Sequence, residues 1–221
     1  MAASWESVRR ARASLHPEEP DEDTASYLVN GTLLVDAGWN AALSMQRYGA
    51  DPVTVTHALF THCHQDHTLG LPGLLFALPA VCAGAAALPQ GDRYPDCVPP
   101  HEVTIVQPGD VVRLGALEVR VSRAFHPLDA RCYRLVDTQT GGSVVFTGDT
   151  AYHAGLARFA AGCDVLVHEA AAGELVLVHL SAGQRASALE RAQQACPRPR
   201  LARAGERMVV RGPGQVEWTA S

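Results

Sequence analysis

The seven residues Thr61-His62-Cys63-His64-Gln65-Asp66-His67 decide what fold and what chemistry this 221-residue chain predicts. They follow the apolar run Ala58-Leu59-Phe60, which predicts a buried strand that ends just before the first histidine. Three imidazoles and a carboxylate are costly to bury together without a cation. Imidazole nitrogen and carboxylate oxygen are also the donors that zinc-class divalent ions prefer. The stretch therefore predicts a metal site at a strand end.

The spacing within this stretch divides its donors into two sets. In an extended chain alternate side chains point the same way, so His62 and His64 face one side. Asp66 and His67 fall in the turn that follows, where they can face a second metal. The alternative interpretation is a run of surface histidines, which the tight clustering directly after a strand disfavours.

Several other stretches have the same form, a short apolar run that ends in a polar or ionisable residue. Together with the first stretch they resemble the metallo-β-lactamase superfamily, and the most similar branch is the ribonuclease Z-like one. The H-x-H-x-D-H run is highly specific, whereas the other matches gain weight from their order. The resemblance spans roughly residues 26–210. The other matching stretches are Leu33–Gly38, His126–Arg134, Val144–Thr150, Val165–Ala170 and Leu175–Ser181.

The resemblance implies an α+β fold, namely a four-layer αββα metallo-β-lactamase-like sandwich with its last crossover helix missing. It implies a single domain over residues 26–221. Residues 1–25 are polar and include an acidic, proline-containing stretch, which predicts a flexible segment. Farther along, Asn30-Gly31 predicts a tight hairpin turn. Residues 41–48 predict a helix that stops at Gly49.

The resemblance also implies a ligand set for two metals. One metal would be held by His62, His64 and His126. The other would be held by Asp66, His67 and His179. Asp149 would bridge the two ions, which are expected to be two Zn²⁺, with Mn²⁺ or Fe²⁺ as alternatives. Two such cations can share a hydroxide, lower its pKa and polarise the substrate oxygen, so the implied reaction is hydrolysis of an ester-like bond.

Other polar residues receive supporting roles. Asp36 is expected to orient a ligand histidine from the second coordination shell, and Glu169 is a further second-shell candidate. Asp66 is a catalytic candidate as well as a ligand. His168 is the other catalytic candidate, although a buried structural pair with Glu169 is the favoured interpretation. His153 is a candidate for substrate binding, and a surface position at a helix start is an equal alternative.

Composition restricts the expected partners and location. The formal charge of −5 and the absence of lysine, with all 18 basic residues arginine, argue against a general polyanion binder. No run of about eighteen apolar residues occurs, so no membrane partner is expected. The N-terminus lacks the apolar core of a signal peptide, and six cysteines are scattered without C-x-x-C spacing. These features predict reduced thiols and a cytoplasmic location.

The chain departs from the ribonuclease Z pattern in two places. In that pattern a helix that opens with a His-Ser-Thr run follows the His-Glu-Ala strand, and its histidine acts as general acid for the leaving group. Here only residues 170–174 separate the two strands, whereas parallel neighbours need a crossover of a dozen or more residues. Either the strands join differently or the chain is a shortened form. The long tRNA-binding arm is also missing.

Three functions from different classes remain open. The first is a dinuclear zinc hydrolase of phosphodiesters, which would use a metal-bridging hydroxide on a small phosphodiester or RNA. The missing arm and the acidic balance make tRNA maturation the weaker choice of substrate. The second is a metallo-hydrolase of a lactone, thioester or β-lactam. The third is a metal-binding but catalytically weak, shortened form. The assembly is left open, with a homodimer as one expectation.

Overall fold

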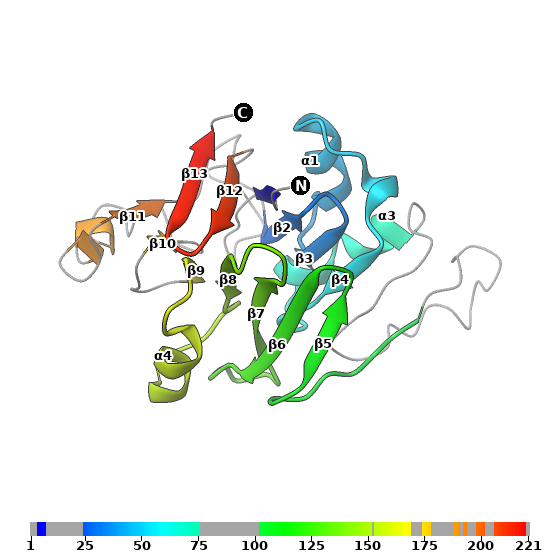
Figure 1. Ribbon diagram of the computed structural model, residues 1–221. Coiled ribbons are helices and arrows are strands. Elements are labelled where there is room, and N and C mark those ends of the chain that lie inside the picture. The colour runs from blue at the N-terminus through cyan, green and yellow to red at the C-terminus, as the bar shows by residue number, and fades with distance from the viewer. Residues whose placement is uncertain are drawn as a thin grey trace.

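Two β-sheets with short helices on their outer faces make up the fold (Figure 1). The computed structural model describes residues 4–7, 24–75, 102–151, 153–168, 174–177, 188–190, 192–193, 198–201 and 206–219. Its labelled helices are α1 (Ala41–Arg47), α2 (Gln65–Thr68), α3 (Leu71–Leu75) and α4 (Ala154–Ala160), with a 3₁₀ turn η1 (Pro52–Thr54), and residues 188–190 and 192–193 are also helical. None of the helices in these ranges is long and apolar enough to cross a membrane.

The first sheet has the strand order β13-β12-β1-β2-β3-β4. Its strands are β1 (Ser4–Ser7), β2 (Ser26–Val29), β3 (Leu33–Ala37), β4 (His57–Leu59), β12 (Arg207–Gly212) and β13 (Gln215–Thr219). The neighbours are antiparallel except for β3 and β4, which run parallel. Because parallel strands end at the same edge of a sheet, the residues after β3 and after β4 meet there.

The second sheet has the strand order β11-β10-β9-β8-β7-β6-β5. Its strands are β5 (Val111–Leu114), β6 (Leu117–Arg123), β7 (Arg131–Asp137), β8 (Ser143–Phe146), β9 (Val165–His168), β10 (Glu174–Leu177) and β11 (Arg198–Leu201). The strands from β5 to β8 pair antiparallel, and those from β8 to β11 pair parallel. β7 therefore separates β6 from β8, which matters for the site.

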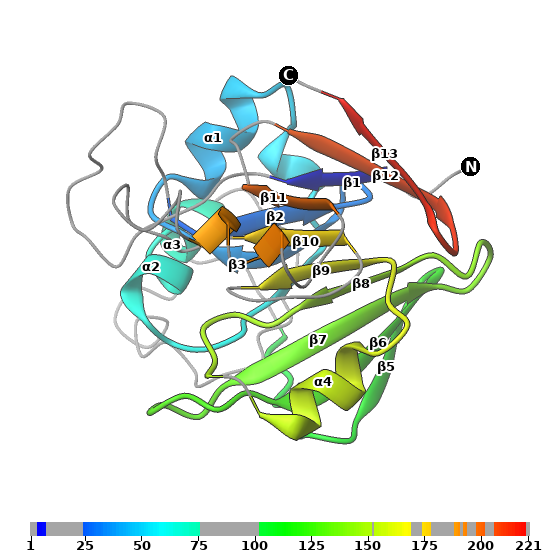
Figure 2. The same cartoon turned by 90° about the vertical axis from the view of Figure 1, so that its left-hand side faces the viewer.

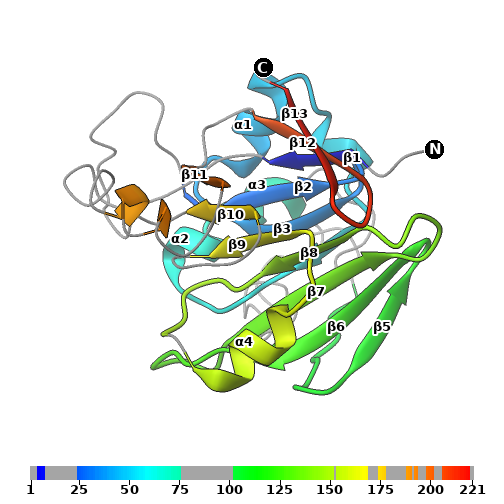
Figure 3. The ribbon, with the colours of Figure 1, turned by 60° about the vertical axis from the view of Figure 1, so that its left-hand side comes forward.

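Buried side chains show the order of the layers. Val35 of β3 and Tyr133 of β7 belong to one cluster between the two sheets. Leu34, on the opposite face of β3, packs in a second cluster with Met45 of α1. Leu166 of β9 belongs to a third cluster that includes α4. The layers are therefore helix, sheet, sheet and helix, which confirms the expected α+β sandwich (Figures 2 and 3).

Local sequence explains the start of the first sheet. Asn30 and Gly31 have φ of 52° and 71°, and the Thr32 amide donates to the Val29 carbonyl at 3.2 Å. Both residue types tolerate this left-handed region, so the predicted hairpin turn between β2 and β3 is confirmed. The predicted helix also forms, as α1, and Gly49 follows it with φ of 75°.

The expectation of a flexible segment over residues 1–25 is wrong at Ser4–Ser7. These residues form β1, which pairs with β2 on one side and with β12 on the other. No local pattern indicates this strand, because its partner β12 is distant in sequence and Ser4 pairs with Val209. Residues 8–23 lie outside the described residues.

The strands β9 and β10 are parallel neighbours. This pairing does not decide between the two alternatives for the connection, a different join or a shortened form, and both stay predictions. The parallel pairing leaves only residues 169–173 to connect them, and these lie outside the described residues.

Candidate metal centre

Four predicted ligands meet at one point between the sheets. His62 and His64 follow β4, His126 follows β6, and Asp149 follows β8. One ligand atom from each of the four lies within 4.8 Å of all the others. Chain segments far apart in sequence thus bring three imidazoles and one carboxylate together. Of these side chains, His62 is fully buried.

The three imidazole rings lie close together, with His64 edge-on to the other two. The Nε2 of His62 lies 2.9 Å from the Nδ1 of His64. The ring of His126 lies 4.6 Å from that of His62 and 4.7 Å from that of His64. Its buried Nε2 has no hydrogen-bond partner among the described residues. A buried nitrogen without a partner is costly, and a shared cation would satisfy all three rings. The donor set therefore fits a zinc-class ion.

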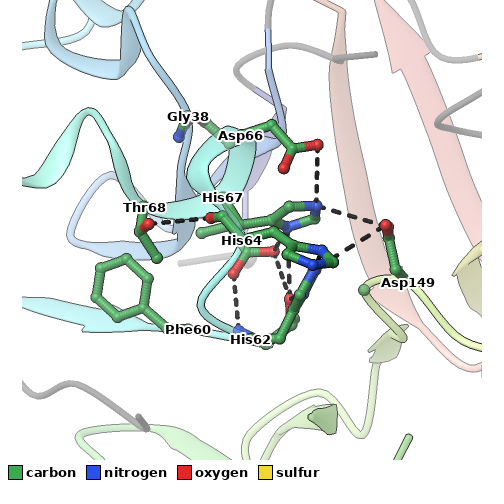
Figure 4. Close-up of polar contacts among 12 residues, drawn as sticks. Gly38, Phe60, His62, His64, Asp66, His67, Thr68 and Asp149 are labelled. Atoms are coloured by element: carbon green, nitrogen blue, oxygen red, sulfur yellow. Dashed lines mark hydrogen bonds and ion pairs between the residues drawn. The ribbon is translucent and has the colours of Figure 1, made fainter. Parts of the chain in front are cut away.

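Asp149 lies between this group and the second predicted set (Figure 4). Its Oδ2 is 4.0 Å from the Nε2 of His62, and its Oδ1 is 3.5 Å from the Nε2 of His67. The Oδ2 of Asp66 is in turn 3.8 Å from the same nitrogen of His67. Each oxygen of Asp149 thus faces one donor set, as a bridging carboxylate would. The third predicted ligand of the second set, His179, lies outside the described residues.

Asp36 fixes the orientation of His67 and of the loop that carries the ligands. It accepts hydrogen bonds from the backbone amide of Thr61, from the hydroxyl of Thr61 and from Nδ1 of His67, each at 2.8 Å. Because Nδ1 of His67 donates to Asp36, its Nε2 is left to face Asp66 and Asp149. The expected second-shell role of Asp36 matches this geometry.

The backbone places Asp36 where it can do this. Asp36 has φ of 55°, and the pairing of β2 with β3 shifts register beside it, between Ser26 and Tyr27. An extra residue in one strand re-aims its side chain, and aspartate is one of the few residue types that tolerate this φ. The bulge turns the carboxylate towards Thr61 and His67.

The pKa values of two neighbouring histidines are shifted in opposite directions. Burial alone would lower the pKa of His67, but the charge of Asp36 and hydrogen bonds with Asp149 and Asp36 outweigh burial and raise it to about 10. Burial, followed by the charge of His67, lowers the pKa of His62 to about 3. Without a cation, therefore, His67 carries the proton and His62 is neutral. A metal would replace that proton.

The loop after β4 is also held from the second sheet. The hydroxyl of Tyr133 donates to the carbonyl of Phe60 at 2.6 Å. The backbone amide of Arg131 donates to the carbonyl of Thr61 at 2.8 Å. These carbonyls belong to the two residues before His62, so the ligand loop is fixed on the side facing the second sheet as well.

The described remaining candidates make their hydrogen bonds with residues outside this cluster. His168 is buried, and its Nδ1 lies 2.8 Å from the hydroxyl of Thr147. Burial lowers the pKa of His168 to about 4, so it is neutral at pH 7. Nδ1 of His153 accepts from the amide of Leu156 at 3.2 Å and so caps α4. The helix start is therefore as expected, but the surface position is not, because Nε2 of His153 is buried and has no hydrogen-bond partner among the described residues; its role in substrate binding stays a prediction. Glu169 lies outside the described residues.

Two contributors to the site were not found from the sequence. Gly148 has φ of 56°, and a Cβ there would lie 2.5 Å from the Thr61 hydroxyl, so only glycine lets Asp149 approach the loop. Thr150 joins the segment of His126 to that of Asp149. Both residues flank Asp149 in the sequence, so their position beside a predicted ligand is the signal that could have identified them.

Residues 32–200 match the family model described as a beta-lactamase superfamily domain. The chain therefore belongs to the metallo-β-lactamase superfamily. It is 32% identical over 173 residues to the uncharacterized protein Rv1339 of Mycobacterium tuberculosis, a match that covers 68% of this chain and 62% of that protein. A shorter match, 48% identical over 42 residues, covers 19% of the chain and 15% of the ribonuclease Z of Pyrobaculum neutrophilum.

Among solved structures, the metallo-beta-lactamase fold protein YhfI from Bacillus subtilis superposes with a TM-score of 0.77 at 19% identity, covering 99% of this chain and 100% of that one. At this identity the likeness supports the fold alone. The chain spans less than two thirds of the length of the curated mycobacterial relatives that it matches, between 60% and 62%.

Proposed function

We propose that the chain is a metal-dependent phosphodiesterase of ribonuclease Z-like type. The observation that carries this proposal is the position of Asp149, which directs one carboxylate oxygen to each of two donor sets. Asp66 beside His67 gives the second set a carboxylate–imidazole character, which suits a divalent cation such as Zn²⁺ that can also bind phosphate oxygens. The local match to a ribonuclease Z supports the same reaction class.

We propose that the chain binds two ions and that both are Zn²⁺. His62, His64, His126 and Asp149 would hold the first, and Asp66, His67, Asp149 and His179 the second. When bound, such ions lower the pKa of water and stabilise negative charge on a substrate oxygen. Mn²⁺ or Fe²⁺ would bind similar donors.

The chain's own residues organise this chemistry. Asp36 holds the proton on Nδ1 of His67 and keeps Nε2 directed into the site. The buried imidazole of His62 is neutral, which is the form that binds a metal. These groups are fixed by hydrogen bonds before any ligand arrives, so little reorganisation is needed on binding.

The substrate that we propose is a small phosphodiester rather than tRNA. A long nucleic acid is held mainly by cations on its phosphates. The chain has no lysine and a net charge of −5. We further propose a cytoplasmic protein with a single domain over residues 26–221, and a homodimer is the assembly to be tested.

Metal content and activity, measured on the same preparation, test the proposal. Purified protein is analysed for bound metal and assayed with bis(p-nitrophenyl) phosphate, a lactone and a chromogenic β-lactam. We expect two ions per chain and turnover of the phosphodiester alone. Turnover of the lactone or β-lactam alone would contradict the phosphodiesterase proposal. Two bound ions with no turnover of any substrate would support the third function, a metal-binding but catalytically weak form.

A further inference from the structure

We propose that Thr150 is a positioning residue of the metal centre. It sets His126 opposite Asp149 through a group of hydrogen bonds, here called the clasp, that joins the two segments carrying these ligands. This inference rests on the proposed metal site. Thr150 directly follows Asp149, and Phe125 directly precedes His126. The clasp therefore acts one residue away from a ligand on each side.

The clasp is a closed set of three hydrogen bonds. The amide of Phe125 donates to Oγ1 of Thr150 at 2.7 Å, and this hydroxyl donates to the carbonyl of Ala151 at 3.0 Å. The amide of Ala151 donates back to the carbonyl of Phe125 at 2.9 Å. Thr150 is only 7% exposed, so its hydroxyl is engaged as both donor and acceptor in a largely buried position.

Sheet topology explains why these two segments are not joined by the strand pairing of the sheet itself. His126 follows β6 and Asp149 follows β8, and β7 lies between these strands in the sheet. No ladder of backbone hydrogen bonds therefore joins the two strand ends. The clasp spans β7 and provides a direct link between them.

The other restraints on the segment around His126 are the ion pair of Asp129 with Arg131 at its far end and the contact of the Phe125 ring with that of His153, whose centroids are 6.3 Å apart. Phe125 and Leu128 are 67% and 42% exposed, and Pro127 cannot donate a backbone hydrogen bond. The amide of Ala124 donates to the carbonyl of Ala130 at 3.1 Å and closes the base of the loop. The position of the His126 ring, 4.6 Å from His62, therefore depends on how Phe125 is held.

The test compares Thr150→Val with Thr150→Ser. Valine keeps the branched shape but leaves the Phe125 amide without its acceptor, whereas serine keeps the hydroxyl. We expect Zn²⁺ affinity, measured by competition with a chromogenic chelator, to fall about 10–100-fold in Thr150→Val and to recover in Thr150→Ser. With Co²⁺ as the probe, the ligand-field spectrum of Thr150→Val should change because one imidazole is misplaced.

Thr138→Val is the matched control. The Thr138 hydroxyl also joins two loops, donating to the carbonyl of Ala116 at 2.9 Å, but it lies just beyond the opposite end of β7. This control should leave Zn²⁺ affinity unchanged. Equal affinity in wild type and Thr150→Val would overturn the clasp, while a wild-type chain that binds no Zn²⁺ would overturn the proposed function itself.

A measurement on the unaltered protein does not depend on whether the variant folds. Amide hydrogen exchange at Phe125 and Ala151 is followed with and without Zn²⁺. A clasp that positions the ligands must exist before the metal binds, so both amides should already be protected in the metal-free protein. If these amides exchanged freely in the metal-free protein and became protected only when Zn²⁺ is added, the metal would be what orders the loop, and the clasp would be rejected.

Discussion

Asp36 shows how much of the site depends on the chemistry of one buried carboxylate. A carboxylate only accepts hydrogen bonds, so all three groups around Asp36 must donate to it. This requirement selects the tautomer of His67. An amide of the same shape can both donate and accept, and it would remove the selection without changing the packing.

We therefore predict that Asp36→Asn weakens binding of the second metal about 10–100-fold while leaving the first bound. Asparagine tolerates the positive φ at this position, so the backbone should be retained. Metal affinity measured by stepwise chelator competition tests this. Asp51→Asn is the matched control, because Asp51 also accepts a backbone hydrogen bond, from Val53, but on the surface. Retention of two equally tight metals in Asp36→Asn would refute the prediction.

His168 gives a second residue-scale prediction, for stability as a function of pH. Its folded-state pKa is lowered by burial from 6.5 to about 4. Between these two values the unfolded chain binds a proton that the folded chain does not, so stability falls as pH drops from 6.5 towards 4. The loss attributable to His168 is on the order of 3 kcal/mol when complete, and none is expected above pH 6.5.

Urea unfolding of wild type and His168→Asn, both with chelator present, isolates this contribution. The other titrating groups are shared, so the difference between the two free energies of unfolding should change with pH only in that window. Asparagine retains a polar atom near the position of Nδ1 and can keep a contact with Thr147. Parallel stability curves for the two proteins between pH 4 and 6.5 would contradict the prediction.

At the scale of elements, the turn after β8 determines whether Asp149 reaches the ligand loop. Gly148 has φ of 56° and would carry a Cβ only 2.5 Å from the Thr61 hydroxyl. Gly162 has a similar φ of 67° but has open space around it. Comparing alanine at these two positions therefore separates the backbone cost of an added Cβ, which both share, from the steric cost, which only Gly148 has.

We predict that Gly162→Ala costs about 1–2 kcal/mol of stability, the usual cost of a left-handed alanine. Gly148→Ala should cost clearly more and should also reduce Zn²⁺ affinity, because Thr61 carries the neighbouring ligand His62. Thermal unfolding with and without Zn²⁺ measures both effects. If the two variants behaved alike, the close approach of Gly148 to Thr61 would have no energetic consequence.

Local elements could be predicted well from the sequence, because their causes are local. The turn at Asn30-Gly31, the end of α1 before Gly49 and the strand Val165–His168 follow from residue conformational preferences and apolar runs. The strand β1 could not be predicted, because its partner β12 is distant in sequence.

The parts of the candidate site that lie in a sequence motif could be predicted. The parts whose position depends on contacts between separate strands could not. The spacing of His62 and His64 gave their common direction. The clasp by Thr150 depends on β6 and β8 ending side by side across β7, and no local pattern shows that. The position of His153 at a helix start was one of two alternatives that the sequence left open; the hydrogen bond from Leu156 to its Nδ1 shows the cap, and the role of its buried Nε2 stays a prediction.

At the scale of the whole molecule, the short connection between β9 and β10 affects the proposed reaction. Residues 169–173 contain no histidine, so the general acid of the ribonuclease Z pattern has no counterpart there. His168 is neutral at pH 7 and buried, which makes it a poor proton donor. Turnover should therefore depend strongly on the leaving group.

We predict measurable cleavage of bis(p-nitrophenyl) phosphate and feeble or no cleavage of precursor tRNA. An activated aryl leaving group departs without a proton, whereas a ribose hydroxyl requires one. Inserting a histidine-bearing helix of the ribonuclease Z type between β9 and β10 should narrow the difference. Efficient 3′ processing of precursor tRNA by the present chain would show that another residue donates the proton.

The bonds from Arg131 and Tyr133 to the ligand loop join the two sheets directly beside the metal cluster. Exchange of the Arg131 amide with solvent requires the two sheets to separate there, so this amide should be among the slowest to exchange in the domain. The loop would then keep its shape through the frequent small openings of the surface. Metal could then enter and leave while the two sheets stay together, because the walls of the site separate only when the whole domain unfolds.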